Sequence, residues 1–312
     1  MLAVLAASVL VQNSLDLESA WKYAQSRGSH ALLIQQNGKT LLERYSRGSA
    51  TTKRMLASGT KSFTGITFAA AIDDGLVKWD TKVGELLPAW KSDPQKSQVT
   101  LQQLISLQSG VDPGEMGRRG GGWNDAVMAS MLHEPGTKFQ YGSNPFLIYG
   151  AAMEAALKGK TFEQHLEDRI LDPLKISVTW NMRTTDGKPQ LAGGAAMTAR
   201  DWATLGQMLL SGGVHEGKRI VSAQSLSLLI EPTKVNSAYG TSFWLGDTDS
   251  KTAILGRPGR PAPGVPKDLY QAVGAGSQKL MIIPSLKMVI VRMGPLAGGR
   301  QWKDEEFFKA LL

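Results

Sequence analysis

The sequence predicts an α/β (α+β) fold in which both ends of the chain share one antiparallel sheet and a helical lobe is inserted between them. Two hairpin signals support this prediction, because Asn37-Gly38 and Pro284-Ser285 each separate two β-like runs. Between the hairpins, apolar residues recur mainly at helical spacing. A helix is expected near each end of the chain, flanking the sheet. The functional site is expected in the cleft between the sheet and the helical lobe.

The elements at the chain ends follow from local signals. A surface helix is expected over Leu15–Arg27, with Asn13 or Ser14 as its cap and Gly28 as its stop. Asn-Gly is the strongest two-residue signal for a hairpin, so the strands beside it are expected to pair directly. The strands and the closing helix are predicted over His30–Gln36, Lys39–Tyr45, Gln278–Ile283, Lys287–Met293 and Asp304–Leu312.

The middle of the chain is predicted to be mostly helical. Residues 14–57 and 195–312 are assigned to a sheet lobe, and residues 58–194 to a helical lobe of the same domain. Two Gly-rich or Pro-rich stretches, Gly117–Trp123 and Gly256–Pro266, are expected to be surface loops. Helices are predicted over Ser58–Asp74, Leu101–Leu107, Asn124–Leu132, Pro145–Leu157, Thr161–Leu171 and Ala199–Leu210.

The composition is that of a globular protein with a sizeable core. Of 312 residues, 42% are hydrophobic and 20% are charged. The formal net charge is +8, but the basic residues are dispersed, so nucleic acid is not an expected partner. There is no cysteine, and the four histidines are isolated, which leaves no thiol chemistry and no pattern of metal ligands. We therefore expect no metal and no organic cofactor.

The chain begins with an apolar stretch of ten residues, Leu2–Val11. It is too short to cross a bilayer, so no stable membrane span is expected. Its length suits the core of a signal peptide, although no basic residue precedes it. Residues 1–13 are therefore either a signal-peptide remnant, which implies a periplasmic or secreted protein, or a first helix, which allows a cytoplasmic one. The sequence carries no signal for the oligomeric state.

Ser58-Gly59-Thr60-Lys61 is the most informative motif. It lies where an exposed segment turns into an apolar-striped helix that ends at Gly75. Residues three apart share one face of a helix, so the Lys61 amine can lie one turn from the Ser58 hydroxyl and accept its proton. The positive end of the helix dipole would also favour an oxyanion beside Ser58. This is the machinery of a serine hydrolase that uses no histidine.

The motif alone is not decisive. With 25 serines and 21 lysines in 312 residues, about two S-x-x-K matches are expected by chance. The second match, Ser19-Ala20-Trp21-Lys22, falls inside the N-terminal surface helix and is interpreted as structural. For Ser58, the alternative interpretation is that it only caps its helix, as serine often does.

Three further stretches follow Ser58 in order: TLQQLISLQSGV at 100–111, PGTKFQYGSN at 135–144 and GGAAMTARD at 193–201. Together with Ser58-Gly59-Thr60-Lys61 they resemble the serine β-lactamase and penicillin-binding-protein-like superfamily. The branch that fits best holds class C β-lactamases, class VIII carboxylesterases, 6-aminohexanoate-oligomer hydrolases and D-amino-acid peptidases. The resemblance runs from about Trp21 to Gly294 and implies a β-lactamase/transpeptidase-like fold.

The resemblance assigns roles to residues in the first two motifs. It implies that Ser58 is the nucleophile and Lys61 its partner in proton transfer. The family's Tyr-x-Asn or Tyr-x-Ser motif matches Tyr141-Gly142-Ser143, with Asn144 one place beyond the usual asparagine. Tyr141 would take the Ser58 proton and pass one to the leaving group. Ser143 and Asn144 would bind substrate.

The third motif departs from the family pattern. It is Lys-Thr-Gly in β-lactamases and His- or Trp-x-Gly in many esterases, and Gly274-Ala275-Gly276 aligns with it here. Gly274 and Gly276 would let substrate approach closely, and the Ser277 N–H would complete an oxyanion hole with the Ser58 N–H. The lysine that suits the carboxylate of penicillins and cephalosporins is absent. The candidates to replace it are Arg118, Arg257 and Arg260.

Three functions are compatible with these motifs, each with a small ester or amide as ligand. A carboxylesterase acting on small esters is the leading hypothesis, because the missing lysine argues against efficient β-lactam turnover. A β-lactamase, or a hydrolase of D-peptides or other amides, is the alternative. The third hypothesis is a non-hydrolytic penicillin-binding sensor or scaffold, which has no need of Ser58, Lys61 and Tyr141 together.

Overall fold

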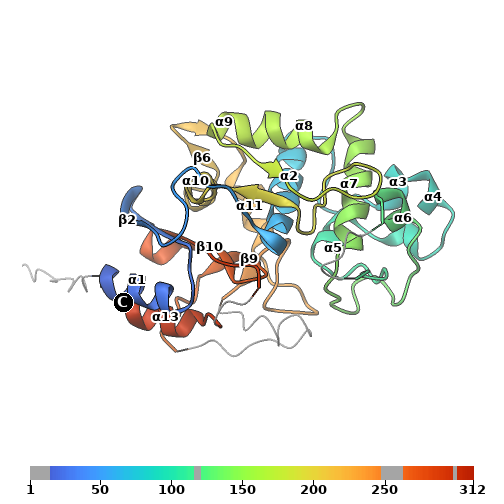
Figure 1. Ribbon diagram of the computed structural model, residues 1–312. Coiled ribbons are helices and arrows are strands. Elements are labelled where there is room, and N and C mark those ends of the chain that lie inside the picture. Colours follow the sequence, from blue (N-terminus) through green and yellow to red (C-terminus); the bar gives the residue numbers. More distant parts are fainter. Residues whose placement is uncertain (1–14, 116–120, 247–262, 298–300) are drawn as a thin grey trace, which may run out of the picture.

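A computed structural model of the protein describes residues 15–115, 121–246, 263–297 and 301–312. The predictions made for residues 1–14 lie outside these ranges, as do the candidate cations Arg118, Arg257 and Arg260. The predicted fold class is confirmed, since one antiparallel sheet carries strands from both ends of the chain and helices fill the middle (Figure 1).

The main sheet has six strands in the order β2-β1-β11-β10-β9-β8, and every neighbouring pair is antiparallel. Both predicted hairpins are confirmed. Asn37 and Gly38 join β1 to β2 with φ values of 51° and 75°, the left-handed conformation that a two-residue hairpin turn requires. Ala31 pairs with Met293, so the first strand lies beside the last. The strands are β1 Ala31–Gln36, β2 Lys39–Tyr45, β8 Trp244–Leu245, β9 Tyr270–Gly274, β10 Gln278–Ile283 and β11 Met288–Met293.

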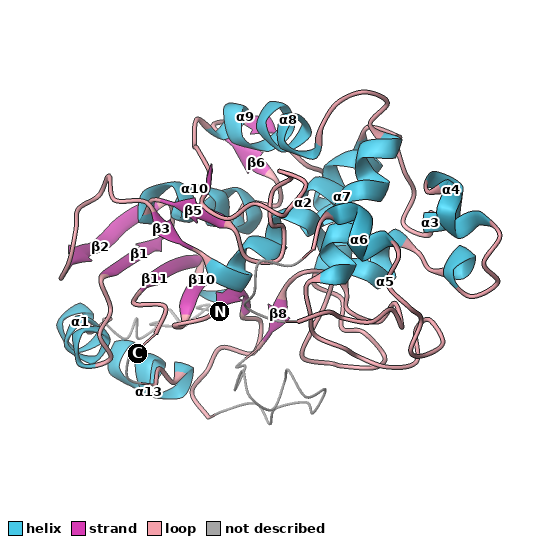
Figure 2. Cartoon of the chain, turned by 45° about the vertical axis from the view of Figure 1, so that its right-hand side comes forward, coloured by secondary structure: helices cyan, strands magenta, loops and turns pink. Residues whose placement is uncertain are grey.

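Helices from the two chain ends cover one face of the sheet (Figure 2). α1 (Leu17–Ser26) and α13 (Asp304–Leu311) bury their apolar residues against this face. Asp16 caps α1, because its side chain accepts a hydrogen bond from the Ser19 N–H at 2.9 Å. The N-terminal helix is therefore where the sequence predicted it, but its cap lies two residues after Ser14.

The opposite face of the sheet packs on the main core. α10 (Ala199–Leu210), predicted with these bounds, lies across this face (Figure 2). Gly206 allows a close approach, since a Cβ atom there would come within 2.7 Å of Leu280 and Val289. Beyond α10, α2 (Ser62–Asp73) runs through the interior and has ten of its twelve residues buried. The sheet lobe and the inserted helices therefore share one core around α2.

The inserted helices pack around α2. α7 (Asn144–Ala156) lies beside α5 (Leu101–Ile105) and α6 (Trp123–Val127). α6 stops before the predicted Leu132, because the chain after it turns to form a bridge between Met131 and Val111. α8 (Phe162–Leu166) continues as the π-helical turn η3 (Glu167–Leu171), in agreement with the predicted span.

Short elements that the sequence did not predict complete the fold. They are β3 Arg54–Met55, η1 Ala57–Lys61, α3 Val83–Leu86, α4 Pro88–Lys91, η2 Lys96–Gln98, α9 Asp172–Leu174, β4 Thr179–Trp180, β5 Ala195–Met197, β6 Val214–His215, β7 Lys218–Arg219, α11 Ala223–Leu229 and η4 Pro284–Leu286.

Among the described residues, no helix is long and apolar enough to cross a membrane. The boundaries between the sheet lobe and the helical lobe, at 57/58 and 194/195, stay a prediction.

Candidate active site

Ser58 lies in a tight turn that leads into α2. The turn is the 3-10 helix η1, whose first hydrogen bond runs from the Gly59 N–H to the Leu56 carbonyl at 3.0 Å. Ala57 has a φ of +48°, which is uncommon for a residue other than glycine and marks a strained backbone. The Ser58 N–H precedes the first bond of the turn, where helix amides lack an intrahelical partner. Ser58 is not the cap of this helix, since Leu56 occupies the cap position.

The Lys61 side chain is buried beside the Ser58 hydroxyl. Its Nζ donates to Ser58 Oγ at 3.3 Å and to the Ala192 carbonyl at 2.7 Å. The ring centroids of Tyr141 and Phe146 lie 4.7 and 5.2 Å from Nζ. Lys61 is only 4% exposed, and burial lowers the pKa of its amine to about 7. At neutral pH a large fraction of the amine is therefore uncharged and able to accept a proton.

Tyr141 completes a cluster with Ser58 and Lys61. Its ring lies 4.7 Å from Lys61 Nζ and stacks on Trp244 with a centroid separation of 5.8 Å. Burial raises the pKa of Tyr141 to about 12, while the nearby Ser58 hydroxyl acts in the opposite direction. The phenol therefore keeps its proton at neutral pH, where Lys61 has partly lost its own.

The Gly-rich stretch at 193–201 packs against the nucleophile turn. β5 pairs with β3, and the Leu56 N–H donates to the Ala195 carbonyl at 2.9 Å. In return, the Ala195 N–H donates to Thr60 Oγ1 at 3.1 Å. Because the neighbouring Ala192 carbonyl accepts from Lys61, this stretch fixes both the turn and the amine.

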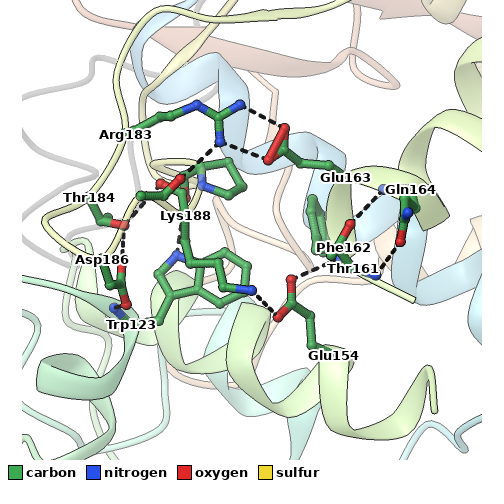
Figure 3. Close-up of polar contacts among 12 residues, drawn as sticks. Trp123, Glu154, Thr161, Phe162, Glu163, Gln164, Arg183, Thr184, Asp186 and Lys188 are labelled. Carbon is green, nitrogen blue, oxygen red and sulfur yellow. Dashed lines mark hydrogen bonds and ion pairs between the residues drawn. The ribbon is translucent and has the colours of Figure 1, made fainter. Parts of the chain in front are cut away.

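A polar network ties the chain that precedes Ala192 to the helical lobe (Figure 3). The Arg183 guanidinium forms paired hydrogen bonds with the Glu163 carboxylate at 2.8 and 2.9 Å. The Asp186 carboxylate accepts from the Trp123 N–H at 2.7 Å and so caps the start of α6. These contacts support the segment from outside the site and involve neither Ser58 nor its partners.

The segment that carries Tyr141 is held by backbone contacts with the chain after α5. The Gln140 N–H donates to the Leu107 carbonyl at 2.8 Å. A Cβ atom on Gly142 would overlap the Pro113 carbonyl oxygen, so only glycine fits the position after Tyr141. The stretch at 100–111 and the Tyr141 motif are therefore parts of one packed unit.

The predicted substrate-binding residues Ser143 and Asn144 begin α7. The N–H groups of both residues donate to the Pro113 carbonyl, at 2.7 and 3.0 Å. The Asn144 side-chain amide donates to the Asp112 carbonyl at 3.1 Å and so anchors this loop. Ser143 is half-buried, and within the described part of the chain its hydroxyl has no hydrogen-bond partner. The Asn144 side chain therefore has a structural role, and substrate binding by Ser143 stays a prediction.

The end of β9 lies against the nucleophile turn. A Cβ atom on Gly274 would overlap the Leu56 carbonyl oxygen and come within 3.1 Å of the Ala57 Cβ. Only glycine allows this approach. The next residue, Ala275, places its N–H directly after the contact, beyond the end of the strand. Ala272, two residues before Gly274, is buried and brings no charge to the site.

Gly276 and Ser277 lie further along, in the three-residue turn between β9 and β10. Their φ values are 73° and 55°. A Cβ atom on Gly276 would overlap the Pro295 carbonyl oxygen, away from the nucleophile turn. The contact of the strand with the nucleophile turn is therefore at Gly274, and the roles expected for Gly276 and the Ser277 N–H beside substrate stay predictions.

The second S-x-x-K match is structural, as predicted. The Ser19 hydroxyl donates to the Asp16 carboxylate at 2.7 Å, within the cap of α1. Lys22 is exposed. This pair has none of the burial that changes the pKa of Lys61.

A family model described as Beta-lactamase matches residues 11–301. The chain belongs to the β-lactamase family. This is the family of serine hydrolases that the sequence resemblance indicated, and the match spans the whole of the candidate site. Under this family assignment, Ala272 or Gly274 stands where β-lactamases carry the lysine of their third motif, depending on the alignment.

Individual relatives of this β-lactamase-family chain differ in name and length. It is 27% identical to "Protein flp" of Staphylococcus aureus (strain MW2) over 169 residues, which are 48% of this chain and 34% of that protein. It is 28% identical to 6-aminohexanoate-dimer hydrolase of Paenarthrobacter ureafaciens over 216 residues, 62% of this chain and 54% of that protein. The chain thus spans about a third to about half the length of these curated relatives.

Solved structures of similar fold span nearly the whole chain. The structure of a family VIII carboxylesterase superposes with a TM-score of 0.72 and covers 95% of this chain and 96% of its own. Its sequence identity is 15%, so the comparison establishes a common fold.

Three features of the site have no signal in the sequence. Trp244, under Tyr141, lies in a short strand without a motif. Ala192 acts through its backbone carbonyl, which no residue type signals. The strained Ala57 is also invisible in the sequence, since alanine ordinarily has a negative φ. A glycine at position 57 would have been the only local signal.

Proposed function

We propose that this β-lactamase-family protein is a serine hydrolase that forms an acyl-enzyme on Ser58, and that its substrates are small carboxylic esters. The observation that carries the proposal is the buried Lys61 amine, 3.3 Å from Ser58 Oγ, whose pKa is lowered to about 7. Desolvation of a lysine beside a hydroxyl converts a cation into a base at neutral pH. A scaffold that only binds ligand would gain nothing from this arrangement.

In the proposed acylation step, the lowered pKa of Lys61 makes it the base and the raised pKa of Tyr141 keeps it protonated as the acid. Neutral Lys61 takes the Ser58 proton as Oγ bonds to the substrate carbonyl carbon. Tyr141 gives its proton to the leaving alkoxide, and Lys61 then returns a proton to Tyr141. In deacylation, water bonds to the acyl carbon while neutral Lys61 takes its proton through Tyr141, and Lys61 returns a proton to Ser58 Oγ as the acyl bond to Ser58 breaks. We therefore assign the base to Lys61, since a phenol with a pKa of about 12 is a poor base at neutral pH.

The oxyanion would be held by two backbone amides. The Ser58 N–H is one, as expected from the sequence. For the second, the contact of Gly274 with the nucleophile turn favours the Ala275 N–H over that of Ser277, which lies two residues further along. Preorganised amides of this kind stabilise the charge that develops in the tetrahedral intermediate.

Replacing Gly274 with alanine is expected to lower kcat by about 10²-fold or more, the typical effect of losing one oxyanion donor. The added methyl group would overlap the Leu56 carbonyl oxygen and push β9 away from Ser58. Steady-state kinetics on a p-nitrophenyl ester measures the effect. Gly28→Ala is a matched control, because a Cβ atom there has no neighbour within 4 Å, although its φ of +71° adds local strain. A Gly274→Ala enzyme with the kcat of the parent would exclude β9 from the oxyanion hole.

The third motif bears on the charge of the substrate. Neither alignment of this motif provides the lysine that would hold a β-lactam carboxylate. Its absence supports ester hydrolysis over β-lactam hydrolysis. Around Tyr141, the buried rings of Trp244, Tyr239 and Phe139 pack edge-on, with centroids 4.7 Å apart for Trp244 and Tyr239 and 5.5 Å apart for Phe139 and Tyr239. These rings hold the phenol in place.

Amide hydrolysis is the second candidate. The relative named 6-aminohexanoate-dimer hydrolase, at 28% identity over 62% of this chain, supports it. The same Ser58, Lys61 and Tyr141 chemistry would serve an amide, since Tyr141 can protonate a leaving amine.

The pH dependence of hydrolysis follows from the same shifts. With neutral Lys61 as the base, kcat/KM should rise about tenfold per unit up to a pH of about 7 and then level off. It should fall only as Tyr141 loses its proton, near pH 12. Initial rates measured from about pH 5 to about pH 10 test this expectation. An inflection above about pH 9 would mean that Lys61 keeps an ordinary pKa.

A substrate panel tests the proposed class. The parent protein is assayed with p-nitrophenyl butyrate, a chromogenic cephalosporin and the cyclic and linear dimers of 6-aminohexanoate. The proposal predicts that the ester has the highest kcat/KM. Faster turnover of an aminohexanoate dimer would establish the amide alternative, and stable acylation without turnover by the cephalosporin would establish a penicillin-binding sensor.

A further inference from the structure

A buried arginine stands behind the turn between β9 and β10. Arg292, on β11, is 1% exposed, and its guanidinium donates only to neutral oxygens among the described residues. The Trp302 ring lies 5.2 Å from its Cζ. Burial lowers the pKa of Arg292 to about 10, so the side chain remains charged at neutral pH. Burying a charge without an ion pair costs free energy. The contacts that the Arg292 guanidinium makes therefore need an explanation.

The guanidinium joins the turn to the start of the sheet. Its Nη1 donates to the carbonyls of Gly276 and Ser277, the second at 2.8 Å. On the other side, Nη2 donates to the Arg27 carbonyl at 3.1 Å and Nε donates to Ser29 Oγ at 2.9 Å. The rigid fork of arginine suits such a bridge, which a lysine could not reproduce.

Gln278 holds the remaining carbonyl of the same turn. Its Nε2 donates to the Ala275 carbonyl at 3.3 Å and to the Gly294 carbonyl at 2.9 Å. Its Oε1 accepts from the Gly294 N–H at 3.0 Å. Gln278 is fully buried. All three carbonyls of the turn, from Ala275 to Ser277, are therefore fixed by buried side chains.

The turn needs such support, because its backbone is strained. Ser277 has a positive φ although it is not glycine, and such conformations persist only where the surroundings impose them. The guanidinium also fits only because residue 294 is glycine, since a Cβ atom there would lie 2.6 Å from both Nη1 and Nη2. The Arg292 contacts thus act on the residues that directly follow Ala275.

We propose that Arg292 is a positioning residue for hydrolysis: by fixing the Gly276 and Ser277 carbonyls, it orients the Ala275 N–H toward the oxyanion formed at Ser58. The inference rests on the proposed function, since it requires acyl transfer to Ser58. Arg292 contacts the rear of the turn and not the substrate. Its loss should therefore affect stabilisation of the tetrahedral state and leave ground-state binding nearly unchanged.

The test compares Arg292→Met and Arg292→Lys with the parent, using p-nitrophenyl butyrate and phenylboronic acid. The boronic acid forms a tetrahedral adduct with a catalytic serine and so depends on the oxyanion hole. For Arg292→Met we expect kcat to fall by about 10²-fold, with KM within about twofold of the parent. The dissociation constant of phenylboronic acid should rise by a similar factor to the fall in kcat. Arg292→Lys should show the same split with a smaller effect.

Ser29→Ala is the matched control. It removes one acceptor of the Arg292 guanidinium on the side away from the turn. It should lower the thermal midpoint and leave kcat and the boronic acid affinity within about twofold of the parent.

The outcomes separate the two proposals. If the parent hydrolyses the ester and Arg292→Met keeps its kcat and boronic acid affinity, the positioning role is wrong and the proposed function stands. A parent without acyl-transfer activity overturns both. If Arg292→Met does not fold, Arg292→Lys and Gly294→Ala decide the question, because the new methyl group of Gly294→Ala displaces the guanidinium.

Discussion

Hydrolysis of p-nitrophenyl butyrate is expected to fall by about 10⁴–10⁶-fold when Ser58 is replaced with alanine. The Ser58 hydroxyl accepts a hydrogen bond from the Lys61 amine at 3.3 Å, and the Tyr141 ring lies 4.7 Å from the same amine. Without the hydroxyl, the base and the acid remain but there is no atom to acylate. Steady-state kinetics with enzyme concentration raised for the variant measures the loss, and near-ultraviolet circular dichroism checks the fold.

Ser19→Ala provides the control for this experiment, since Ser19 and Lys22 have the same spacing. The Ser19 hydroxyl serves only the cap of α1, so its removal should change the free energy of unfolding by about 1 kcal/mol or less and leave kcat unchanged. Equal activity of Ser58→Ala and the parent would remove Ser58 from the mechanism.

Replacing Lys61 with methionine is expected to reduce kcat/KM by about 10³–10⁵-fold without lowering stability at acidic pH. Methionine has a similar length and suits the apolar surroundings, but it cannot accept the Ser58 proton. The pKa of Lys61 is lowered to about 7 in the folded protein from 10.5. Between about pH 7 and pH 10.5 the unfolded chain therefore binds a proton at Lys61 that the folded protein does not. The Lys61 contribution to the free energy of unfolding is thus greatest above about pH 10.5 and is lost as the pH falls to about 7.

This linkage can be measured directly. Across that pH window the free energy of unfolding of the parent should fall by about 3–5 kcal/mol relative to Lys61→Met. Urea unfolding of both proteins at several pH values gives the difference, and Lys22→Met controls for the removal of a surface charge. If the parent and Lys61→Met show the same pH dependence, then the Lys61 amine is not desolvated as the structure indicates.

The fold was predictable where local chemistry determines it. Asn37-Gly38 fixes its hairpin because both residues adopt positive φ, and α10 has the bounds that its apolar periodicity predicts. Boundaries set by tertiary contacts were less predictable. α6 is shorter than its sequence pattern because the following chain pairs with Val111. α11 and β8 were missed because they are short and lie among turn residues.

For the site, side chains with distinctive chemistry were predictable and backbone geometry was not. The structure brings Ser58, Lys61 and Tyr141 together from two segments that lie about 80 residues apart in the sequence. The desolvation of Lys61 could not be inferred, because it comes from Tyr141, Phe146 and the surrounding core. The contact of Gly274 with the nucleophile turn could not be inferred either, because no local signal distinguishes Gly274 from Gly276.

Active-site labelling with a fluorophosphonate, followed by intact mass spectrometry and peptide mapping, tests the role of Ser58 most directly. We expect one label per chain, located on Ser58, with loss of ester hydrolysis in proportion to labelling and no label on Ser58→Ala. Labelling at another residue, or full hydrolytic activity after stoichiometric labelling of Ser58, would contradict the assignment of Ser58 as the nucleophile.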